Sequence, residues 1–413
     1  MDASGGERVS HHDLVRRCLN EFAPPRELHR SAKIKLNVKI NEYDWKNTKV
    51  LVTGASGFKG SWLCAVLLKL GAKVYGTARP QKNPLSAYNV LKLDKHIIKV
   101  PADISDRQQV YDMINSVEPD VIFHLAAKAL VPVSLRDPRR TFEINVMGTV
   151  NIIEACRKLK VCSRLLICST DHVFGSVSPS ELPPGGFDES ARVSYGGPYD
   201  TSKAAMELAV RCYHYTYWSE LPAIGITRCA NVFGNGDTNQ RRIIPLFVHS
   251  AVVEKVIPLR FRANGRQFIH ITDTIAGYIR AASTLNEGGC TLKSNRTRPD
   301  DRSPFTPTYH FAMEQYEKTA HPYIRVDELA KLTASIYGSE IDESQCIELA
   351  PNENEIQALN CSATCKSIGW ESRKDMRTAL TELGEWYKNL GDIETLGRLI
   401  EADVEGIYKN LIS

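Results

Sequence analysis

A hydroxyl, a carboxylate and an imidazole follow one another directly after an apolar run. The run at 165–168 leads into Ser169, Thr170, Asp171 and His172. A buried strand that ends in this way presents several polar side chains at the edge of a sheet. A carboxyl group that burial keeps protonated can act as an acid, and an imidazole can act as a base. The alternative is that Asp171 caps a helix and that His172 makes ordinary hydrogen bonds in a loop.

A tyrosine and a lysine lie four residues apart in the segment P-Y-D-T-S-K. Tyr199 and Lys203 stand at the start of a helix-like stretch at 201–215, so both side chains lie on one helical face. A lysine ammonium lowers the pKa of a nearby phenol, which can then take a hydroxyl proton while a hydride leaves the same carbon. The pair therefore indicates oxidation of an alcohol. An exposed pair on a surface helix is the alternative.

Asp171 and His172 go beyond the needs of alcohol oxidation, which requires only a hydroxyl such as that of Thr170. They fit an elimination. Once C4 of a hexose is a ketone, the C5 proton is acidic, so a base can remove it while an acid protonates the departing C6 hydroxyl. A stored hydride can then return to C6. The catalytic candidates are therefore Thr170, Asp171 as the acid, His172 as the base, Tyr199 and Lys203.

Three glycines lie between a predicted strand and a predicted helix, in V-T-G-A-S-G-F-K-G. Gly54 permits a tight turn, Gly57 lets the backbone approach a pyrophosphate, and Gly60 lets the helix pack closely. The N-terminus of that helix offers free N–H groups and a positive dipole to phosphates. The segment predicts a dinucleotide site, and a plain turn is the alternative.

The ends of the next strands bear on which dinucleotide binds. The second strand ends without the acidic residue that would hold a ribose 2′-hydroxyl, and its Arg79 either meets the 2′-phosphate of NADP or is solvated. Asp103, after the third strand, is placed to accept a hydrogen bond from an adenine amine. Ala126 and Ala127, after the fourth, would line the path of the cofactor. We expect NAD, and NADP stays open.

From about residue 49 the chain alternates short apolar segments with longer amphipathic ones. The alternation predicts strands at 50–52, 73–78, 96–100, 121–125 and 164–168, and helices at 61–70, 106–117 and 142–159. Strands separated by helices imply right-handed crossovers and a parallel sheet covered on both faces. The predicted fold class is α/β, a Rossmann-type doubly wound sheet with a smaller C-terminal lobe.

Three regions follow along the chain. Residues 1–47 form an N-terminal arm outside the core, in which alternation at 34–40 predicts a half-buried strand. Residues 48–235 form the dinucleotide-binding domain. Residues 236–413 mainly form a lobe for the substrate, interleaved with the last strands of the sheet. This lobe is predicted to include apolar segments at 243–256, 274–285 and 326–336 and a surface insertion near 288–320.

The composition excludes several classes of protein. The formal net charge of +4 over 413 residues gives no reason to expect nucleic acid as a partner. The sequence contains no long apolar run and no secretory signal near its start, so no membrane contact is expected. The 11 cysteines are scattered, which favours reduced thiols in a cytoplasmic protein. Cys361 and Cys365 lack a second pair of ligands, so no metal is expected.

Several segments resemble extended short-chain dehydrogenase/reductases, and within them the CDP-glucose 4,6-dehydratase family. The G-x-x-G-x-x-G spacing and the order of Ser/Thr, Tyr and Lys are those of the superfamily, and T-G-A-S-G-F-K-G-S-W-L at 53–63 is the most specific match. Further matches are F-H-L-A-A-K-A-L-V at 123–131, T-F-E-I-N-V-M-G-T-V at 141–150, R-C-A-N-V-F-G-N-G-D at 228–237, R-I-I-P at 242–245 and L-N-C-S-A-T-C-K-S-I-G-W at 359–370. The likeness covers roughly residues 48–390.

The resemblance implies a bound NAD that is reduced and reoxidised in each turnover, and a nucleotide-diphosphate sugar as substrate. By position, Thr170 would hydrogen-bond O4 of the sugar, Asp171 would be the acid, and Asn231 and Arg266 would hold the diphosphate. The residues expected at the cofactor are Gly54, Ser56, Gly57, Phe58, Lys59, Gly60, Arg79, Asp103, Ile104, Leu125, Ala126, Ala127, Lys128, Asn145, Tyr199 and Lys203. Those expected at the substrate are Lys128, Thr170, Asn231, Arg242 and Arg266. Relatives commonly pair through the helix after Phe142 and the helix that carries Tyr199, so a homodimer is expected.

The chain departs from the dehydratase family at particular residues. His172 stands where the family has lysine, Lys128 stands where it has glutamine, and G-R-Q-F-I-H at 265–270 is closer to epimerases and decarboxylases. The leading prediction is an NAD-dependent nucleotide-sugar 4,6-dehydratase, a hydro-lyase. A nucleotide-sugar 4-epimerase or uronate decarboxylase that uses the same Tyr199–Lys203 pair is the alternative. A non-catalytic, nucleotide-binding regulatory subunit is a third alternative, which the intact catalytic residues disfavour.

Overall fold

The computed structural model describes residues 43–285, 306–313, 321–349 and 354–412. The predicted strand at 34–40 and nearly all of the predicted N-terminal arm lie outside the described residues. Most of the predicted insertion near 288–320 lies outside them too.

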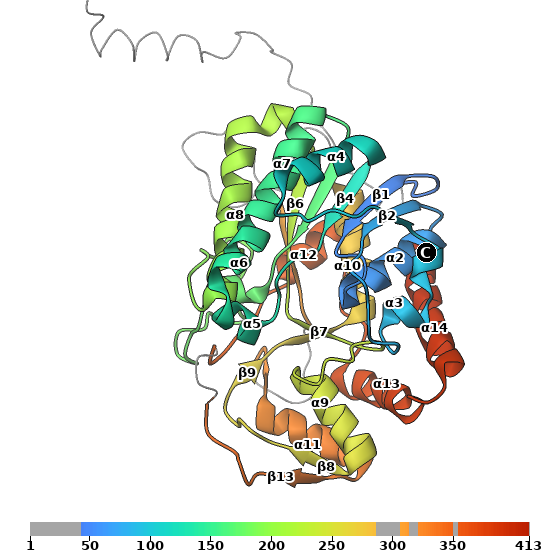
Figure 1. Cartoon of the computed structure of the whole chain (residues 1–413). Helices are drawn as coiled ribbons and strands as arrows, with labels where there is room; N and C mark the ends of the chain where they lie inside the picture. The colour runs from blue at the N-terminus through green and yellow to red at the C-terminus, as the bar shows by residue number, and fades with distance from the viewer. Residues whose placement is uncertain (1–42, 286–305, 314–320, 350–353, 413) are drawn as a thin grey trace, which may run out of the picture. The chain divides into compact units, whose positions relative to one another are not determined.

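A parallel sheet of seven strands lies at the centre of the described residues (Figure 1). Its strands are β1 (Lys49–Thr53), β2 (Lys73–Thr77), β3 (Ile98–Lys99), β4 (Val121–His124), β5 (Arg164–Cys168), β6 (Ala223–Cys229) and β11 (Thr308–Phe311). Their order is β11-β6-β5-β4-β1-β2-β3, and every neighbouring pair is parallel. Because β1 lies between β2 and β4, the winding direction changes there, which is where such sheets bind ligands. The predicted doubly wound fold is confirmed.

Successive side chains of each strand bury opposite faces of this sheet. Val50 and Val52 pack with helices α2 (Phe58–Lys69), α10 (Ile271–Thr284) and α14 (Ile393–Ile412). Leu51, between them, packs with α4 (Arg107–Val117), α7 (Gly148–Leu159) and α8 (Pro198–Tyr217). Figure 1 shows these two groups of helices on the two sides of the sheet. Since both faces are covered, the strands are continuous apolar runs, and this made them visible in the sequence.

The helix predicted at 142–159 consists of several segments. The structure has α6 (Pro138–Phe142), then a π-helical turn, η2 (Glu143–Met147), and then α7. A wide turn adds a residue without changing which residues are apolar, so the periodicity could not reveal it. Within the predicted dinucleotide-binding domain the other predicted helices and strands are present, and the third strand is reduced to two residues. Shorter elements of this region are α3 (Ala87–Val90), η1 (Leu93–Lys95), α5 (Val131–Arg136), η3 (Asp171–Phe174) and η4 (Trp218–Glu220).

The described residues of the C-terminal half form three small sheets and several helices. The small sheets pair β7 (Asn231–Phe233) with β10 (Phe268–His270), β8 (Val256–Pro258) with β13 (Glu340–Asp342), and β9 (Gly265–Arg266) with β12 (Ile324–Arg325). The helices are α9 (Ile243–His249), η5 (Ser250–Glu254), α11 (Val326–Tyr337), α12 (Ser362–Ile368) and α13 (Met376–Lys388). In Figure 1, α9, α11, β8 and β13 lie together at the bottom.

Two segments that the sequence assigned to the C-terminal lobe or its insertion are associated with the central sheet. One packs on it and the other is one of its strands. Helix α10, predicted as part of the lobe, packs on β5 and β6. Strand β11, inside the stretch predicted as an insertion, pairs with β6 at the edge of the sheet. An apolar run does not reveal which sheet it joins, and this explains both differences. Among the described residues, no helix is long and apolar enough to cross a membrane.

Candidate active site

The glycine-rich turn after β1 is shaped for close approach of the backbone. Gly54 has a φ of +75°, which strains any residue with a side chain, and a Cβ there would lie 3.0 Å from the Ala126 nitrogen. A Cβ on Gly60 would lie 2.2 Å from the Gly54 carbonyl oxygen, so only glycine lets α2 start this close to the turn. No described side chain caps α2, so the N–H groups of its first residues, from Phe58 to Gly60, are available to an anion. The turn therefore fits a dinucleotide pyrophosphate.

The other residues predicted to contact the cofactor here lie in the turn itself, in the first turn of α2 and just after β2. Ser56 and Gly57 complete the turn before α2 begins. Lys59 extends from the first turn of α2, and its Nζ lies 3.2 Å from the hydroxyl oxygen of Tyr278 in α10. Arg79, just after β2, is exposed. The ammonium of Lys59 is thus turned toward α10, whereas the guanidinium of Arg79 is accessible to solvent.

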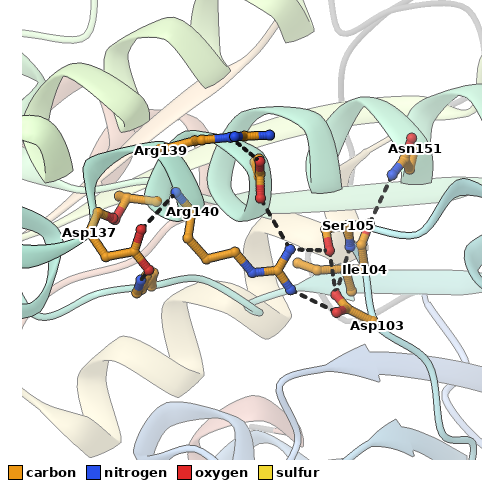
Figure 2. A network of polar contacts seen from close by, with 10 residues as sticks. Asp103, Ile104, Ser105, Asp137, Arg139, Arg140 and Asn151 are labelled. Carbon is orange, nitrogen blue, oxygen red and sulfur yellow. Dashed lines mark hydrogen bonds and ion pairs between the residues drawn. The ribbon is translucent and has the colours of Figure 1, made fainter.

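An arginine holds the carboxylate that was predicted to meet the adenine (Figure 2). Arg140 of α6 donates to Oδ2 of Asp103 at 2.7 Å and to Oγ of Ser105 at 2.8 Å. Ser105 donates to Oδ1 of Asp103 from its N–H at 3.0 Å and from its hydroxyl at 2.7 Å. These bonds, those from Ser105 foremost, lower the pKa of Asp103, so the group is an anion. The Ile104 carbonyl accepts from Asn151 at 3.0 Å, which fixes the same loop to α7.

The segment after β4 is held next to the glycine-rich turn by buried polar groups. Thr53 accepts from the Leu125 N–H at its carbonyl, at 3.2 Å, and from the Ala126 N–H at its hydroxyl, at 3.1 Å. The same hydroxyl lies 2.8 Å from Nδ1 of His124. Burial lowers the pKa of His124 to about 3, so its ring is neutral. Ala127 continues this segment and is half-buried. These contacts fix the backbone along the predicted path of the cofactor.

Asn145 in the π-helical turn joins the segment after β4 to the helix that carries the tyrosine. Its Oδ1 accepts from the Lys128 N–H at 2.8 Å, and its Nδ2 donates to the Lys128 carbonyl at 3.2 Å. Nδ2 also donates to Oγ of Ser202 in α8 at 2.9 Å. Lys128 was predicted to contact both the cofactor and the substrate. Its ammonium forms an ion pair with Asp137 at 2.6 Å. Asn145 therefore has a clear role as a linker, and the charge of Lys128 is already engaged.

Tyr199 and Lys203 are both buried in α8, at the spacing that the sequence indicated. Lys203 donates from Nζ to the Cys168 carbonyl at the end of β5, at 2.5 Å. Burial, aided by the charge of Lys59, lowers the pKa of Lys203 to about 8. Burial raises the pKa of Tyr199, and a hydrogen bond with Thr170 opposes this rise. The phenol is therefore protonated in the free protein and needs further positive charge beside it to act as a base.

Asp171 has one oxygen that the described protein leaves without a partner. Its Oδ1 accepts from the Thr170 hydroxyl at 2.9 Å, while its Oδ2 is buried and makes no hydrogen bond with any described residue. Burial raises the pKa of Asp171, although His172, Thr170 and Arg266 oppose the rise. A carboxyl group in this state readily holds a proton on Oδ2. The side chain is not locked in a structural contact, so it is available as an acid.

His172 lies beside the tyrosine and contacts a carboxylate that the sequence analysis did not identify. Its Nδ1 lies 2.9 Å from Oδ1 of Asp200, and its ring centroid lies 5.4 Å from that of Tyr199, with the rings inclined at 72°. Burial lowers the pKa of His172, but the hydrogen bond to Asp200 and the charge of Asp171 outweigh this effect, so the net pKa is raised. The structure thus brings the five predicted catalytic residues together at the ends of β5 and the start of α8.

Arg266 approaches this cluster from the C-terminal half of the chain. It lies in β9, is buried, and its charge lowers the pKa of both Asp171 and His172, so it is close to both. Its Nη1 donates to the Glu355 carbonyl at 3.2 Å, which orients the guanidinium. A buried arginine in this place is suited to a diphosphate.

The other two predicted substrate residues also come from the C-terminal half of the chain. Arg242 precedes α9, pairs with Asp237 at 2.9 Å, and its charge lowers the pKa of Tyr199. Asn231 in β7 donates from Nδ2 to the Gln267 carbonyl at 3.2 Å, which leaves its own oxygen for another donor. The half-exposed Arg242 can therefore contact a ligand at the tyrosine, and Asn231 is held in a fixed orientation.

The part of the sequence that contains these residues matches an established family. A sequence model described as the NAD dependent epimerase/dehydratase family matches residues 50–292, more than half of the chain. The chain belongs to this family. The match includes the glycine-rich turn and the catalytic cluster and extends to α10. The predicted membership of the extended short-chain dehydrogenase/reductases is confirmed, and the cofactor of the family is NAD.

Relatives in this family include dehydratases and epimerases. The chain is 26% identical over 360 residues to CDP-glucose 4,6-dehydratase of Salmonella typhimurium, which covers 84% of this chain and 93% of the relative. A dTDP-glucose 4,6-dehydratase of Streptomyces venezuelae, solved with NAD and TYD bound, is 25% identical with a TM-score of 0.66, covering 84% of this chain and 99% of that one. A UDP-glucose 4-epimerase of Thermotoga maritima, solved with UDP-glucose, is 19% identical with a TM-score of 0.67, covering 83% and 99%. The resemblance to dehydratases is confirmed, and the fold is shared with the epimerase.

Family motifs reveal some of the site but not its supporting residues. Asp200 follows Tyr199 directly, and an acidic residue in the first turn of a helix is ordinary, so nothing in the sequence marks it as a partner of His172. Arg140 and Asp137 lie in a segment that shows no pattern beyond a helix start. A carboxylate next to the catalytic tyrosine is the only signal that could have pointed to Asp200.

Proposed function

We propose that the protein is a nucleotide-sugar 4,6-dehydratase. A hexose carried by a nucleoside diphosphate is oxidised at C4, loses water across C5 and C6, and leaves as a 4-keto-6-deoxy sugar. One observation carries the proposal: Oδ2 of Asp171 is buried without a described partner beside Thr170, His172 and Tyr199. A dehydratase needs an acid there, whereas an epimerase does not. The similarity to CDP-glucose 4,6-dehydratase supports the same conclusion.

Bound NAD is part of this proposal, and the residues of the chain fit it. The turn from Gly54 to Gly60 excludes side chains where the dinucleotide must approach, and α2 offers its N-terminal N–H groups. When bound, NAD accepts a hydride from C4 of the sugar and later returns it to C6. Residues 48–235 would hold the cofactor and residues 236–413 mainly the sugar nucleotide. The exposed Arg79 keeps NADP as the alternative cofactor.

Tyr199 would act on the C4 hydroxyl. The charge of Arg242 lowers the pKa of Tyr199. A protonated Lys203, one helical turn away, would favour the phenolate further, so that Tyr199 would take the proton while the hydride leaves C4. Thr170 hydrogen-bonds with Tyr199 and donates to Asp171, so it connects the residue that gains this proton with the residue that later needs one. The oxidation step therefore supplies the proton for the elimination.

Asp171 and His172 would then remove water. His172 takes the C5 proton, and the C5–H electrons form the double bond as the bond from C6 to its hydroxyl oxygen breaks. Asp171 gives its proton to that oxygen, which leaves as water. His172 returns its proton to C5 when the hydride reaches C6, and Asp171 regains a proton from Tyr199 through Thr170. The raised pKa of Asp171 and that of His172 suit an acid and a base in turn.

The nucleotide part of the substrate would contact the arginines around this cluster. Buried Arg266 and half-exposed Arg242 are suited to the diphosphate, and Asn231 to a neighbouring oxygen. Asp137 engages the Lys128 ammonium and Asn145 engages both backbone groups of Lys128, so a direct contact of Lys128 with a ligand would require one of these bonds to open. The nucleotide base is left to the experiment below.

A homodimer and a cytoplasmic location complete the proposal. Met147 at the end of η2 and Leu208 and Tyr215 along α8 are 50%, 58% and 64% exposed, and these are parts of the two helices expected to pair. Burial of such a face against a second copy removes apolar surface from water. Replacing Leu208 by arginine should turn a dimer into a monomer in light scattering. The scattered cysteines of the sequence favour a reducing compartment.

Mass spectrometry after incubation with CDP-, UDP-, GDP- and dTDP-hexoses tests the proposal. One donor should give a product lighter by one water molecule. Inversion at C4 without a change of mass would instead identify an epimerase, the candidate that the similarity to UDP-glucose 4-epimerase favours. No reaction with any donor would refute both.

A further inference from the structure

The proposed base contacts a carboxylate that comes from a different element. Nδ1 of His172, in the short turn η3, lies 2.9 Å from Oδ1 of Asp200, in the first turn of α8. The two side chains are 19% and 7% exposed. An exposed pair would be weakened by water, whereas a shielded carboxylate holds its partner in a defined orientation.

This contact determines which nitrogen of His172 can take a proton. An ionised carboxylate only accepts hydrogen bonds, so Nδ1 must carry the hydrogen. In the neutral ring the lone pair is then on Nε2, at the other side of the imidazole. The ring stays beside that of Tyr199, at a centroid distance of 5.4 Å. The base for C5 is therefore held next to the residue that acts on C4.

We propose that Asp200 is a positioning residue, which fixes His172 in the tautomer and orientation that remove the C5 proton. The inference rests on the proposed function, because it concerns the base of that elimination. Asp200 acts on the elimination through His172 and does not meet the reacting atoms. Its charge also raises the pKa of Tyr199. It also accounts for the departure from the family at His172, since an imidazole needs a partner to select its tautomer and a lysine does not.

Asn354 supports the pair from the C-terminal half of the chain. Its Nδ2 lies 3.3 Å from Oδ2 of Asp200 and 3.4 Å from Nδ1 of His172. The side chain is buried, and the carbonyl of the next residue, Glu355, accepts from Arg266 at 3.2 Å. Asn354 therefore occupies the second carboxylate oxygen and links the pair to the segment that orients Arg266.

Charged groups on three elements face His172 and set its pH dependence. They are Asp171 in the same turn, Asp200 in α8 and Arg266 in β9. Burial lowers the pKa of His172 and Arg266 acts in the same direction, but the two carboxylates outweigh them and the net pKa is raised. His172 removes a proton only when neutral, so water loss rises with pH through this pKa. Without the Asp200 carboxylate, the rise should move to lower pH.

The Asp200→Asn variant separates the two chemical steps. Single turnovers with the sugar nucleotide that the wild type converts give the rate of nicotinamide reduction by absorbance and the rate of water loss by mass spectrometry. We expect nicotinamide reduction to stay within about twofold of the wild type and water loss to slow about 100-fold. Asp273→Asn is the matched control, since Asp273 is a buried carboxylate that accepts from Ser372 and two backbone N–H groups. It should leave the ratio of the two rates unchanged.

Each outcome separates this inference from the proposed function. An equal loss of both rates, or unchanged water loss, would overturn the role of Asp200 and leave the dehydratase intact. A wild type that dehydrates no donor would refute the proposed function itself. If Asp200→Asn does not fold, the inference is tested on the wild type. Nitrogen NMR with isotope-labelled histidine then shows which ring nitrogen of His172 carries the hydrogen. The signal that His172→Gln removes should belong to a ring with its hydrogen on Nδ1, and a hydrogen on Nε2 would overturn the inference.

Discussion

Two proton-handling pairs meet in this site, and they are built differently. Tyr199 and Lys203 lie four residues apart in one helix, and Lys203 gives its hydrogen bond to the Cys168 carbonyl. His172 and Asp200 come from two elements, 28 residues apart in sequence, and contact each other directly. In the first pair we expect the lysine to act on the phenol through its charge. In the second the carboxylate acts through orientation. Oxidation and elimination should therefore respond to different changes.

The largest effect is expected for Tyr199→Phe, which removes the group that takes the C4 proton. Since oxidation precedes elimination, nicotinamide reduction and water loss should both fall, by about 10³-fold or more. Tyr195→Phe is the matched control, because Tyr195 is 80% exposed and should leave both rates unchanged. Near-normal turnover of Tyr199→Phe would remove this tyrosine from the mechanism.

Asp171→Asn should break the second step and spare the first. We expect water loss to fall about 100-fold while nicotinamide reduction continues, so that reduced cofactor accumulates. At neutral pH the variant should also melt at a higher temperature. The raised pKa of Asp171 means that ionising this buried carboxyl group lowers the stability of the folded protein as pH rises, and asparagine carries no charge. Asp188→Asn, at an exposed position, is the control for both measurements. Parallel loss of both rates would contradict a specific role in elimination.

The two steps should also differ in their pH dependence. Lys203 is a cation below its pKa of about 8, so oxidation should decline as pH rises beyond that value. Water loss should decline at low pH, where His172 is protonated, and again at high pH, where Asp171 has lost its proton. Single-turnover rates measured across pH give both curves. Superimposable curves would show that one group controls both steps.

The smallest effect is expected for Asn354→Ala, because its hydrogen bond to Oδ2 of Asp200 is long, at 3.3 Å. Water loss should slow a few-fold, with nicotinamide reduction unchanged. Asn115→Ala, on the exposed side of α4, is the control. A loss as large as that of Asp200→Asn would mean that Asn354, rather than the carboxylate, orients the imidazole.

The same contrast explains what could be predicted from the sequence. Tyr199, Lys203 and the glycines of the turn act within one short segment, where spacing alone fixes their geometry. The strands were visible because both faces of the sheet are covered by helices, so each strand is an apolar run. The fold and the first pair therefore follow from local patterns.

The second pair could not be predicted in the same way. Its partner carboxylate is brought to His172 by the packing of α8 against the turn after β5, which no local pattern encodes. The π-helical turn that carries Asn145 and the edge strand β11 were missed for related reasons. In the first, one added residue leaves the apolar period unchanged, and in the second, the pairing spans about 80 residues of chain. Neither the wide turn nor the long-range contacts alter the local pattern of apolar residues.

The fate of the C4 hydrogen tests the central claim most directly. A sugar nucleotide that carries deuterium at C4 is incubated with the protein, and the product is analysed by mass spectrometry and NMR. If the ketone at C4 leads to dehydration, the deuterium must appear on C6 of a product that has lost one water molecule. Deuterium that returns to C4 of a sugar that keeps its C6 hydroxyl would contradict the account.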